Sequence, residues 1–407
     1  MTRVSLETSL HTARVLVCAG TGGVGKTTIA AALAIQAALI GRRTLVLTID
    51  PAKRLADALG LETLGGVPTA VDLSKLTDGD PASGEAFLDA MMLDAKPTFD
   101  RLIERLTLDE KERERIFKSR IYEHLSSALA GSAEYAAMEQ VHELVHSGRY
   151  DLIVVDTPPA DHALDFLRAP RRLRDFLESR FVHTLLRPAM SASRIGMRLF
   201  GRPLQRMLGL LERIAGAGFL DDLTEFLRAI EGLSSGFRER ATRVEEILLG
   251  EETGFILIAS PRSGHQASAR EFMAELDRFR VPMVALVVNR LQPWPSGIRP
   301  SELRERCHEA ALLRDGERME KALAEDRDQA TPSISDVSDL AESITEYALI
   351  CVGEQESVER LGAVAARRRL RCHTVVELSG EIAHLDGLLK IGTQLRTESN
   401  ESPRSRV

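Results

Sequence analysis

The sequence predicts an α/β fold in which helices cover both faces of a doubly wound, mostly parallel sheet, with an inserted helical subdomain. Short apolar runs recur along the chain, and residues 152–155 and 283–288 are continuously apolar, as strands buried on both faces are. Segments with helical periodicity separate these runs, which is the order that produces a parallel sheet. Two helical stretches, at about 84–146 and 164–250, exceed what simple crossovers need, so we expect them to form the subdomain.

Taken in order, the chain begins with a polar lead-in at 1–13 and continues as a single domain over 14–395. A tail at 396–407 is rich in Ser, Glu and Arg, which predicts disorder. The first strand is expected to begin at Val15, with a helix at 29–35 after the loop that follows it. The other expected strands are 44–50, 71–73, 150–156, 255–260, 283–289 and 374–378. Further helices are expected at 53–59, at 267–279, at 301–366 with a break near Pro332, and after His384.

A glycine-rich loop stands between the first strand and its helix. Residues 20–28 read G-T-G-G-V-G-K-T-T, which satisfies the P-loop pattern of nucleoside triphosphate sites. Glycines let backbone N–H groups turn toward phosphate oxygens, Lys26 can reach the β- and γ-phosphates, and the Thr27 hydroxyl can ligate Mg²⁺. The Lys-Thr pair, with a strand before it and a helix after it, favours this interpretation over an ordinary glycine turn. The candidate nucleotide-binding residues in the loop are Gly20, Thr21, Gly22, Gly23, Val24, Gly25, Lys26, Thr27 and Thr28.

Two aspartates end apolar runs that the pattern assigns to the sheet. Asp156 ends the run at 152–155, where a carboxylate can support Mg²⁺ beside Thr27; a helix cap or turn aspartate is the alternative. Asp50 ends a strand that we expect to lie beside the strand before the loop, and could orient the water that attacks the γ-phosphate. An Asp-Pro turn at Asp50 explains this residue equally well from spacing alone.

Three sequence blocks together resemble the ArsA-type ATPases, which include arsenite-pump ATPases and the ATPases that target tail-anchored membrane proteins. The blocks are the P-loop, the segment D-P-A at 50–52 followed by Leu55 and Asp57, and the segment D-T-P-P-A-D-H at 156–162. The segment V-V-N at 287–289 falls where the family places the asparagine that reads adenine. The resemblance covers most of the chain and implies a P-loop NTPase fold.

This resemblance also implies roles for individual residues. It implies phosphate binding at 22–28, water positioning by Asp50, metal support by Asp156 and adenine contact by Asn289. Together with the chemistry of the loop, this makes Lys26 and Asp50 the catalytic candidates, and Thr27 and Asp156 the metal candidates. ATP and Mg²⁺ would be the cofactors of an ATP hydrolase that acts as a dimeric switch coupled to a hydrophobic client or a membrane partner. The alternatives are the energy-coupling subunit of an arsenite-like anion exporter, or an ATP-binding regulatory module with low turnover.

The chain departs at four positions from the pattern of the family or of the wider class of such ATPases. Thr21 stands where that class has an early lysine that crosses to the partner's phosphates. Lys53 and Arg54 replace the usual His-Ser pair, so one of them could supply the missing charge; a heterodimer with a lysine-bearing related ATPase is the other hypothesis, beside a homodimer. Asp161 replaces a glycine of the second switch, which weakens the expectation of a backbone contact there.

Composition excludes several classes of function. The formal net charge of −7 and the pI near 5.9 provide no electrostatic footprint for nucleic acid. The four cysteines lie far apart with no C-x-x-C pair, so we expect neither a disulfide framework nor a structural zinc site. An N-terminus without an apolar signal segment and the absence of a long apolar stretch predict a soluble, cytoplasmic protein.

The region 181–250 holds Met190, Met197 and Met207 among many leucines. Methionine suits adaptable surfaces that bind an apolar helix, as a comparable subdomain does in the targeting ATPases. Packing of the subdomain's own core explains the same residues. The sequence leaves both interpretations open.

Overall fold

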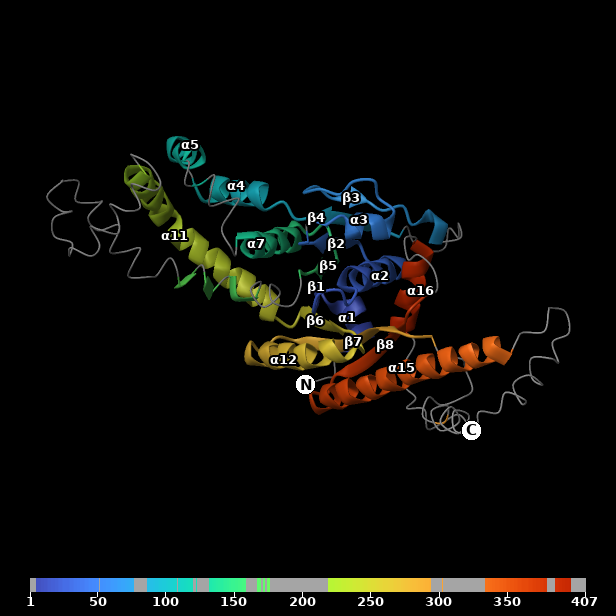
Figure 1. The fold of residues 1–407 in the computed structure, drawn as a ribbon. Helices are drawn as coiled ribbons and strands as arrows, with labels where there is room; N and C mark the ends of the chain where they lie inside the picture. Colours follow the sequence, from blue (N-terminus) through green and yellow to red (C-terminus); the bar gives the residue numbers. More distant parts are fainter. Residues whose placement is uncertain are drawn as a thin grey trace, which may run out of the picture.

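The fold is an eight-stranded sheet with helices on both faces (Figure 1). The computed structural model describes residues 5–50, 52–76, 86–107, 109–119, 122, 132–158, 167–169, 171–172, 174–175, 219–293, 302, 334–378 and 385–396. Within this part the strand order is β3-β4-β2-β5-β1-β6-β7-β8, and all neighbours pair in parallel except β3 and β4. The α/β, doubly wound fold predicted from the sequence is therefore confirmed.

The strands match most of the expected apolar runs. They are β1 (Val15–Gly20), β2 (Thr44–Thr48), β3 (Thr69–Ala70), β4 (Leu88–Met92), β5 (Leu152–Asp156), β6 (Thr253–Ala259), β7 (Met283–Leu291) and β8 (Arg371–Val376). Every residue of β1, β2, β5 and β6 is buried, as expected for central strands covered on both faces.

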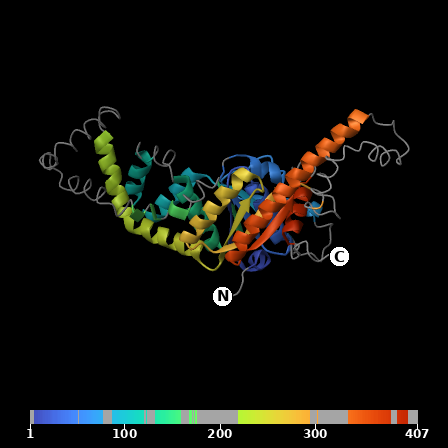
Figure 2. The same cartoon turned by 60° about the horizontal axis from the view of Figure 1, so that its bottom comes forward.

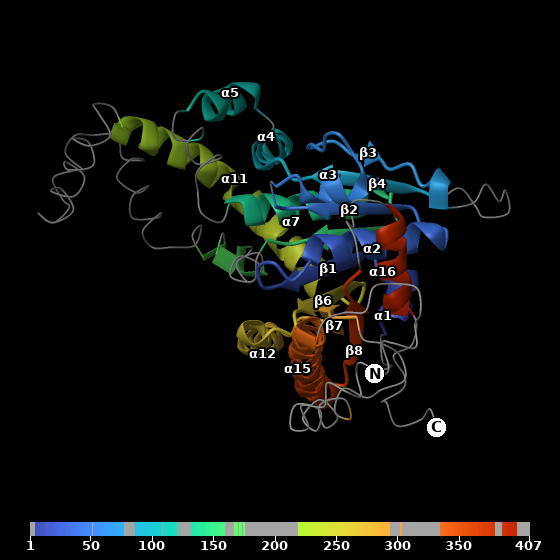
Figure 3. The same cartoon turned by 45° about the vertical axis from the view of Figure 1, so that its right-hand side comes forward.

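One face of the sheet is covered by helices from the two ends of the chain. They are α1 (Leu6–Thr12), α2 (Lys26–Leu39), α3 (Arg54–Leu59) and α16 (Leu385–Arg396), and α16 lies along α2 in Figure 3. The helix α2 is buried on nearly all sides because the sheet covers one side and α16 another, which explains its almost unbroken apolar sequence. The phosphate-loop helix is thereby fixed in the centre of the molecule.

The other face is covered by helices from the middle of the chain and by the helix α15. They are α4 (Ala95–Leu106), α5 (Glu110–Lys118), α7 (Ser132–Ser147), α11 (Phe219–Leu249), α12 (Ser263–Arg278) and α15 (Ile334–Arg367). Figure 2 shows α11 and α15 extending away from the sheet at opposite ends. A short 3₁₀ turn, Ser74–Leu76, completes the described elements. In the described residues, no helix combines the length and apolarity that a membrane span requires.

The position of β5 corrects one expectation. The strand that ends near Asp50 was expected beside the phosphate-loop strand, but β5 lies between β1 and β2 and pairs with both. Asp156 is in register with Cys18 on one side and with Thr48 on the other. This order places the end of β5, rather than the end of β2, directly beside the loop.

Three predicted elements were wrong. The lead-in contains α1, whose Leu6 and Leu10 are 1% exposed, because two apolar residues four apart are enough to seat a short helix on the core. The helical stretch from residue 84 contains β4; its Met91 was assigned to a helical pattern, but so short a segment has no reliable period. The strand expected at 71–73 is instead β3, two residues earlier.

Other predictions of elements are confirmed, with shifted ends. Helices form at α3, α12 and α16, and the segment around Tyr347 is part of α15, as expected. Gly60 ends α3 with a left-handed φ of 70°. The methionines at 190, 197 and 207, residues 159–166 and the tail from 397 lie outside the described residues.

Candidate functional site

The loop between β1 and α2 requires glycine at two positions, because a Cβ there would collide with neighbouring atoms. A Cβ on Gly20 would lie 2.2 Å from the carbonyl oxygen of Ile258 in β6. Gly25 is the N-cap of α2 and has a φ of 90°, and a Cβ there would lie 2.4 Å from Nδ2 of Asn289. Gly22 and Gly23 are exposed, so the N–H groups of this loop are accessible to a ligand at the N-terminus of α2.

Lys26 is the first residue of α2 and turns back over the loop. Its Nζ donates a hydrogen bond to the carbonyl oxygen of Thr21 at 2.9 Å, and the residue is only 8% exposed. Burial lowers the pKa of Lys26, while the nearby charges of Asp156 and Asp50 act to raise it. The ammonium is thus placed between two acidic side chains at the edge of the loop.

Asp156 is at the centre of the site and is 1% exposed. Its Oδ2 accepts hydrogen bonds from the Thr27 hydroxyl at 2.8 Å and from the Thr48 hydroxyl at 3.0 Å. Its Oδ1 is buried without a hydrogen-bond partner among the described residues. Burial raises the pKa of Asp156 to about 6, although both hydroxyls and Lys26 act to lower it.

These residues fit a magnesium ion. A buried carboxylate oxygen without a partner is costly unless a cation or ordered water satisfies it. Asp156 and the Thr27 hydroxyl supply oxygen ligands, which Mg²⁺ prefers and commonly binds through retained waters. The orphaned Oδ1 therefore marks where Asp156 would support the metal.

Asp50 divides its two carboxylate oxygens between a turn and an ion pair. Oδ1 accepts a hydrogen bond from the backbone N–H of Ala52 at 3.0 Å, which is the turn that the Asp-Pro sequence indicates. Oδ2 lies 3.5 Å from Nη1 of Arg54. Arg54 also acts on Lys26 through charge, so both residues face the same end of the site.

Asn289 joins the end of β7 to the phosphate loop. Its Nδ2 donates a hydrogen bond of 2.8 Å to the carbonyl oxygen of Val24, and the side chain is 5% exposed. Because the amide nitrogen is used by the loop, the orientation leaves Oδ1 as an acceptor. An amide oxygen of this kind can accept a hydrogen bond from an amino group of a ligand.

The structure thus brings together the candidate residues of the loop with Asp156 and Asn289, and places Asp50 close to Lys26. Sequence reasoning missed Thr48 and Thr157. The Thr157 hydroxyl donates to the carbonyl oxygen of Cys18 at 2.9 Å and ties the end of β5 to β1. The position of both threonines at strand ends was the only signal available in the sequence. Their contacts with other strands could not be predicted without knowing the strand order.

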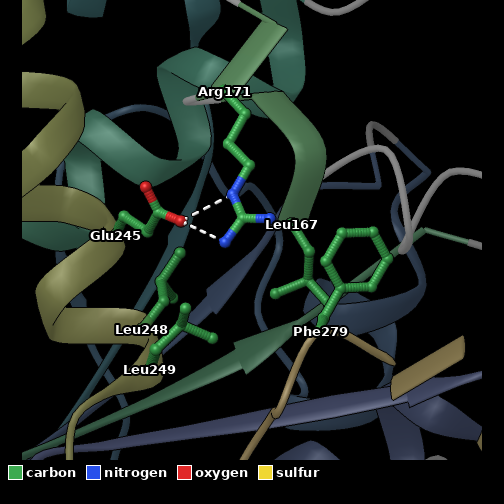
Figure 4. Close-up of a pocket in the computed structure, with 6 residues that line it drawn as sticks. All are labelled: Leu167, Arg171, Glu245, Leu248, Leu249 and Phe279. Carbon is green, nitrogen blue, oxygen red and sulfur yellow. Dashed lines mark hydrogen bonds and ion pairs between the residues drawn. The ribbon is translucent and has the colours of Figure 1, made fainter. Parts of the chain in front are cut away.

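A separate hollow lies on the other side of the sheet (Figure 4). The Arg171 guanidinium pairs with Glu245 across it at 2.7 Å, above a floor of apolar side chains. It leaves space for no more than about one water molecule, so it is not a nucleotide pocket. Its lining residues are Leu167, Arg171, Glu245, Leu248, Leu249 and Phe279.

Comparison with known proteins agrees with this geometry. A sequence model of a family described as anion-transporting ATPase matches residues 13–307. An uncharacterized protein of Streptomyces coelicolor is 36% identical over 191 residues, which are 46% of this chain and 44% of that protein. The ATPase GET3 of Malassezia globosa is 26% identical over 290 residues, covering 71% of this chain and 76% of that protein. A putative arsenical pump-driving ATPase of Halobacterium salinarum is 28% identical over 298 residues, covering 69% of this chain and 42% of that protein. The chain thus spans less than half the length of two of these relatives.

Proposed function

The chain belongs to the anion-transporting ATPase family, and from this premise we propose that it hydrolyses ATP with Mg²⁺ at the site around Lys26. The observation that carries the proposal is the Asp156 carboxylate, which is bonded to Thr27 through one oxygen and is unpartnered and buried at the other. This arrangement unites a phosphate loop with an acid at the end of the neighbouring strand, as metal-assisted phosphoryl transfer requires.

Each side chain has a distinct role in this proposal. The loop N–H groups and Lys26 bind the phosphates, and Lys26 balances charge that develops on the γ-phosphate. Thr27 and Asp156 hold Mg²⁺, which would neutralise phosphate charge when bound. Asp50 accepts a hydrogen bond from the attacking water and orients it, and Asn289 selects adenine through its Oδ1.

Titration with ATP tests this assignment of the site. The purified chain should bind ATP more tightly in Mg²⁺ than in EDTA, and Lys26→Ala should lose most of that affinity. Lys390→Ala, at an exposed position of α16 outside the proposed site, is a matched control that should bind as the wild type does. Equal ATP affinity in Lys26→Ala and in the wild type would remove the loop from the proposed mechanism.

We propose that Arg54 supplies the cationic charge that Thr21 lacks. Its guanidinium lies 3.5 Å from the Asp50 carboxylate and acts electrostatically on Lys26. Lys53, at the N-terminal cap of α3, is the alternative; both side chains are exposed, but Lys53 makes no ion pair with a described residue. Arg54 is therefore the better placed of the two to stabilise the transition state.

We further propose that nucleotide drives a dimeric switch whose movement reaches the helical subdomain. The helix α7 leads into β5 and so to Asp156, and its Glu139 accepts a hydrogen bond of 2.9 Å from Nε of Arg240 in α11. Glu139 is fully buried, and breaking a buried ion pair is strongly unfavourable. The pair therefore supports the idea that α7 and α11 move together. Light scattering tests the switch: a non-hydrolysable ATP analogue should produce a dimer that ADP does not.

An apolar helix of a client or membrane protein is the partner that we propose for this switch. The leucine- and methionine-rich composition of 181–250 supports the proposal, as does the resemblance to the targeting ATPases. Hydrophobic helices should co-purify with the full chain and be lost when 181–220 is shortened. Strong stimulation of ATP hydrolysis by arsenite, with no such helix bound, would instead favour an anion exporter subunit.

A further inference from the structure

Arg290 has an unusual backbone conformation for its place in the fold. Three residues other than glycine have positive φ in the described part of the chain: Arg280 at 54°, Arg290 at 66° and Arg369 at 59°. Arg280 and Arg369 lie two residues after the ends of α12 and α15, where a left-handed residue commonly ends a helix. Arg290 instead lies within the strand β7. A left-handed arginine inside a strand requires a different explanation.

The explanation is a β-bulge at the carboxyl end of β7. Asn289 pairs with Val375 of β8 and Leu291 pairs with Val376, so Arg290 is an extra residue in the ladder. In a regular strand, consecutive side chains point to opposite faces. The bulge removes this alternation: Nδ2 of Asn289 lies 2.4 Å, and Nε of Arg290 3.9 Å, from the position that a Cβ on Gly25 would occupy. Both side chains therefore approach the phosphate loop.

Contacts just after Arg290 hold the bulge in place. The backbone N–H of Gln292 donates to Oε2 of Glu354 at 2.7 Å, and Nε2 of Gln292 donates to Oε2 of Glu377 at 3.0 Å. Glu354 is 7% exposed and comes from α15. The segment is thus bonded to α15 and to the residue that follows β8, and these contacts fix the backbone next to Arg290.

The positive charge of Arg290 has no acidic partner within the described part of the chain. Its side chain is exposed, and its guanidinium makes no hydrogen bond or ion pair with a described residue. The Arg290 side chain approaches Gly25 at the N-terminus of α2, which carries partial positive charge. Lys26 is the next residue after Gly25. The N-terminus of α2, Lys26 and Arg290 all bring positive charge to this point, and Arg290 has no acidic partner among the described residues, which favours an anion.

We propose that Arg290 binds the part of the phosphate chain next to the ribose, which ATP and ADP share. This inference rests on the proposed function, because that function places adenine at Asn289 and the γ-phosphate near Asp50. Arg290 follows the base-reading residue and approaches Gly25, which precedes Lys26. It therefore lies between the base and the terminal phosphate, and should strengthen binding of both nucleotides equally.

Calorimetric titration with Mg·ADP and Mg·ATP tests the role of Arg290. We expect Arg290→Gln and Arg290→Gly to lose about tenfold in affinity for each nucleotide, as expected for one charge-assisted hydrogen bond. Arg290→Gly keeps a residue that favours positive φ but removes the guanidinium. Arg280→Gln removes another exposed, left-handed arginine, and should bind both nucleotides as the wild type does.

Two outcomes would contradict the proposed role of Arg290 without contradicting the proposed function. Wild-type affinity in Arg290→Gly would show that only the backbone conformation matters, and a loss confined to ATP would place the guanidinium at the γ-phosphate. The Lys26→Ala variant, titrated alongside, separates these outcomes from failure of the proposed function. If Lys26→Ala bound as the wild type did, or the wild type bound neither nucleotide, the proposed site itself would be wrong.

Discussion

The Thr27 hydroxyl donates a 2.8 Å hydrogen bond to the Asp156 carboxylate, although 129 residues separate the two in the chain. The contact forms because β5 pairs with β1 and ends beside the loop that precedes α2. It joins the phosphate loop to the acid that supports the metal, and leaves the other oxygen of Asp156 without a partner among the described residues. The first prediction follows from that unpartnered oxygen.

Asp156→Asn should remove Mg²⁺-dependent ATP hydrolysis while stabilising the metal-free protein. Burial raises the pKa of Asp156 to about 6, so its charge opposes folding at pH 7. The shift of about two units corresponds to roughly 3 kcal/mol in the free energy of unfolding. Urea denaturation in EDTA measures this gain, and Asp57→Asn, at an exposed position in α3, should show none. A metal-free Asp156→Asn protein less stable than the wild type would contradict the assignment.

Arg54→Ala should lower kcat by roughly tenfold to a hundredfold, with little change in KM, because the charge is required in the transition state. The neighbouring Lys53→Ala is the matched control and should keep the wild-type kcat. Steady-state phosphate release over a range of ATP concentrations provides both constants. Equal rates in the two variants would exclude Arg54 as the replacement for the missing lysine.

Gly25→Ala should abolish ATP binding, whereas Gly23→Ala should only weaken it. Both glycines have positive φ, of 90° and 77°, so both substitutions introduce backbone strain of about 1–3 kcal/mol. Only Gly25 has a neighbour in the way, since its Cβ would meet the Asn289 amide, while Gly23 has open space. ATP titration compares the two variants. The reverse order of affinities would show that the contact between Asn289 and the loop is unimportant.

The protein should lose stability below pH 6.5 because of His142. Burial, together with the charges of Arg240 and Arg243 in α11, His146 in α7 and Arg105 in α4, lowers the pKa of His142 to about 4. The imidazole is 3% exposed and neutral in the folded protein, whereas the unfolded chain takes up a proton near pH 6.5. The contribution of His142 to the free energy of unfolding is therefore complete above pH 6.5 and falls as the pH drops toward 4, by about 2 kcal/mol at pH 5, while protonation of Asp156 acts in the opposite direction.

Urea denaturation at pH 7.5 and pH 5 measures this dependence. His142→Gln should flatten the loss between the two values, because glutamine does not titrate. His146→Gln changes the neighbouring imidazole on the same helix and should keep the wild-type pH dependence. If His142→Gln and the wild type lost the same stability at pH 5, another group would be responsible.

The sheet and the loop could be predicted from the sequence because their signals are local. The loop pattern around Lys26 and the buried strand before Asp156 each lie within one short segment. The strand β4 could not be separated from a helix, because Phe87 and Met91 are four residues apart, a spacing that fits both a helix face and a strand face over so short a run. The helix α1 was missed because only Leu6 and Leu10 reach the core.

The contacts within the site depended on strand order, which no local pattern contains. Thr48 bonds to Asp156 only because β5 lies between β1 and β2, whereas the sequence had favoured β2 next to β1. Arg290 gave no signal either, since a bulge appears only in the pairing of β7 with β8. Residues that reach the site from other strands, such as Thr48 and Arg290, were therefore harder to predict than the phosphate loop and Asp156.

Phosphate release from Mg·ATP by the purified chain is the most direct test of the central claim, that this site hydrolyses ATP. We expect steady release that EDTA stops, that Lys26→Ala and Asp50→Asn reduce by at least about a hundredfold, and that Lys390→Ala leaves unchanged. Release at the wild-type rate in Lys26→Ala, or no release above background from the wild type, would contradict the claim.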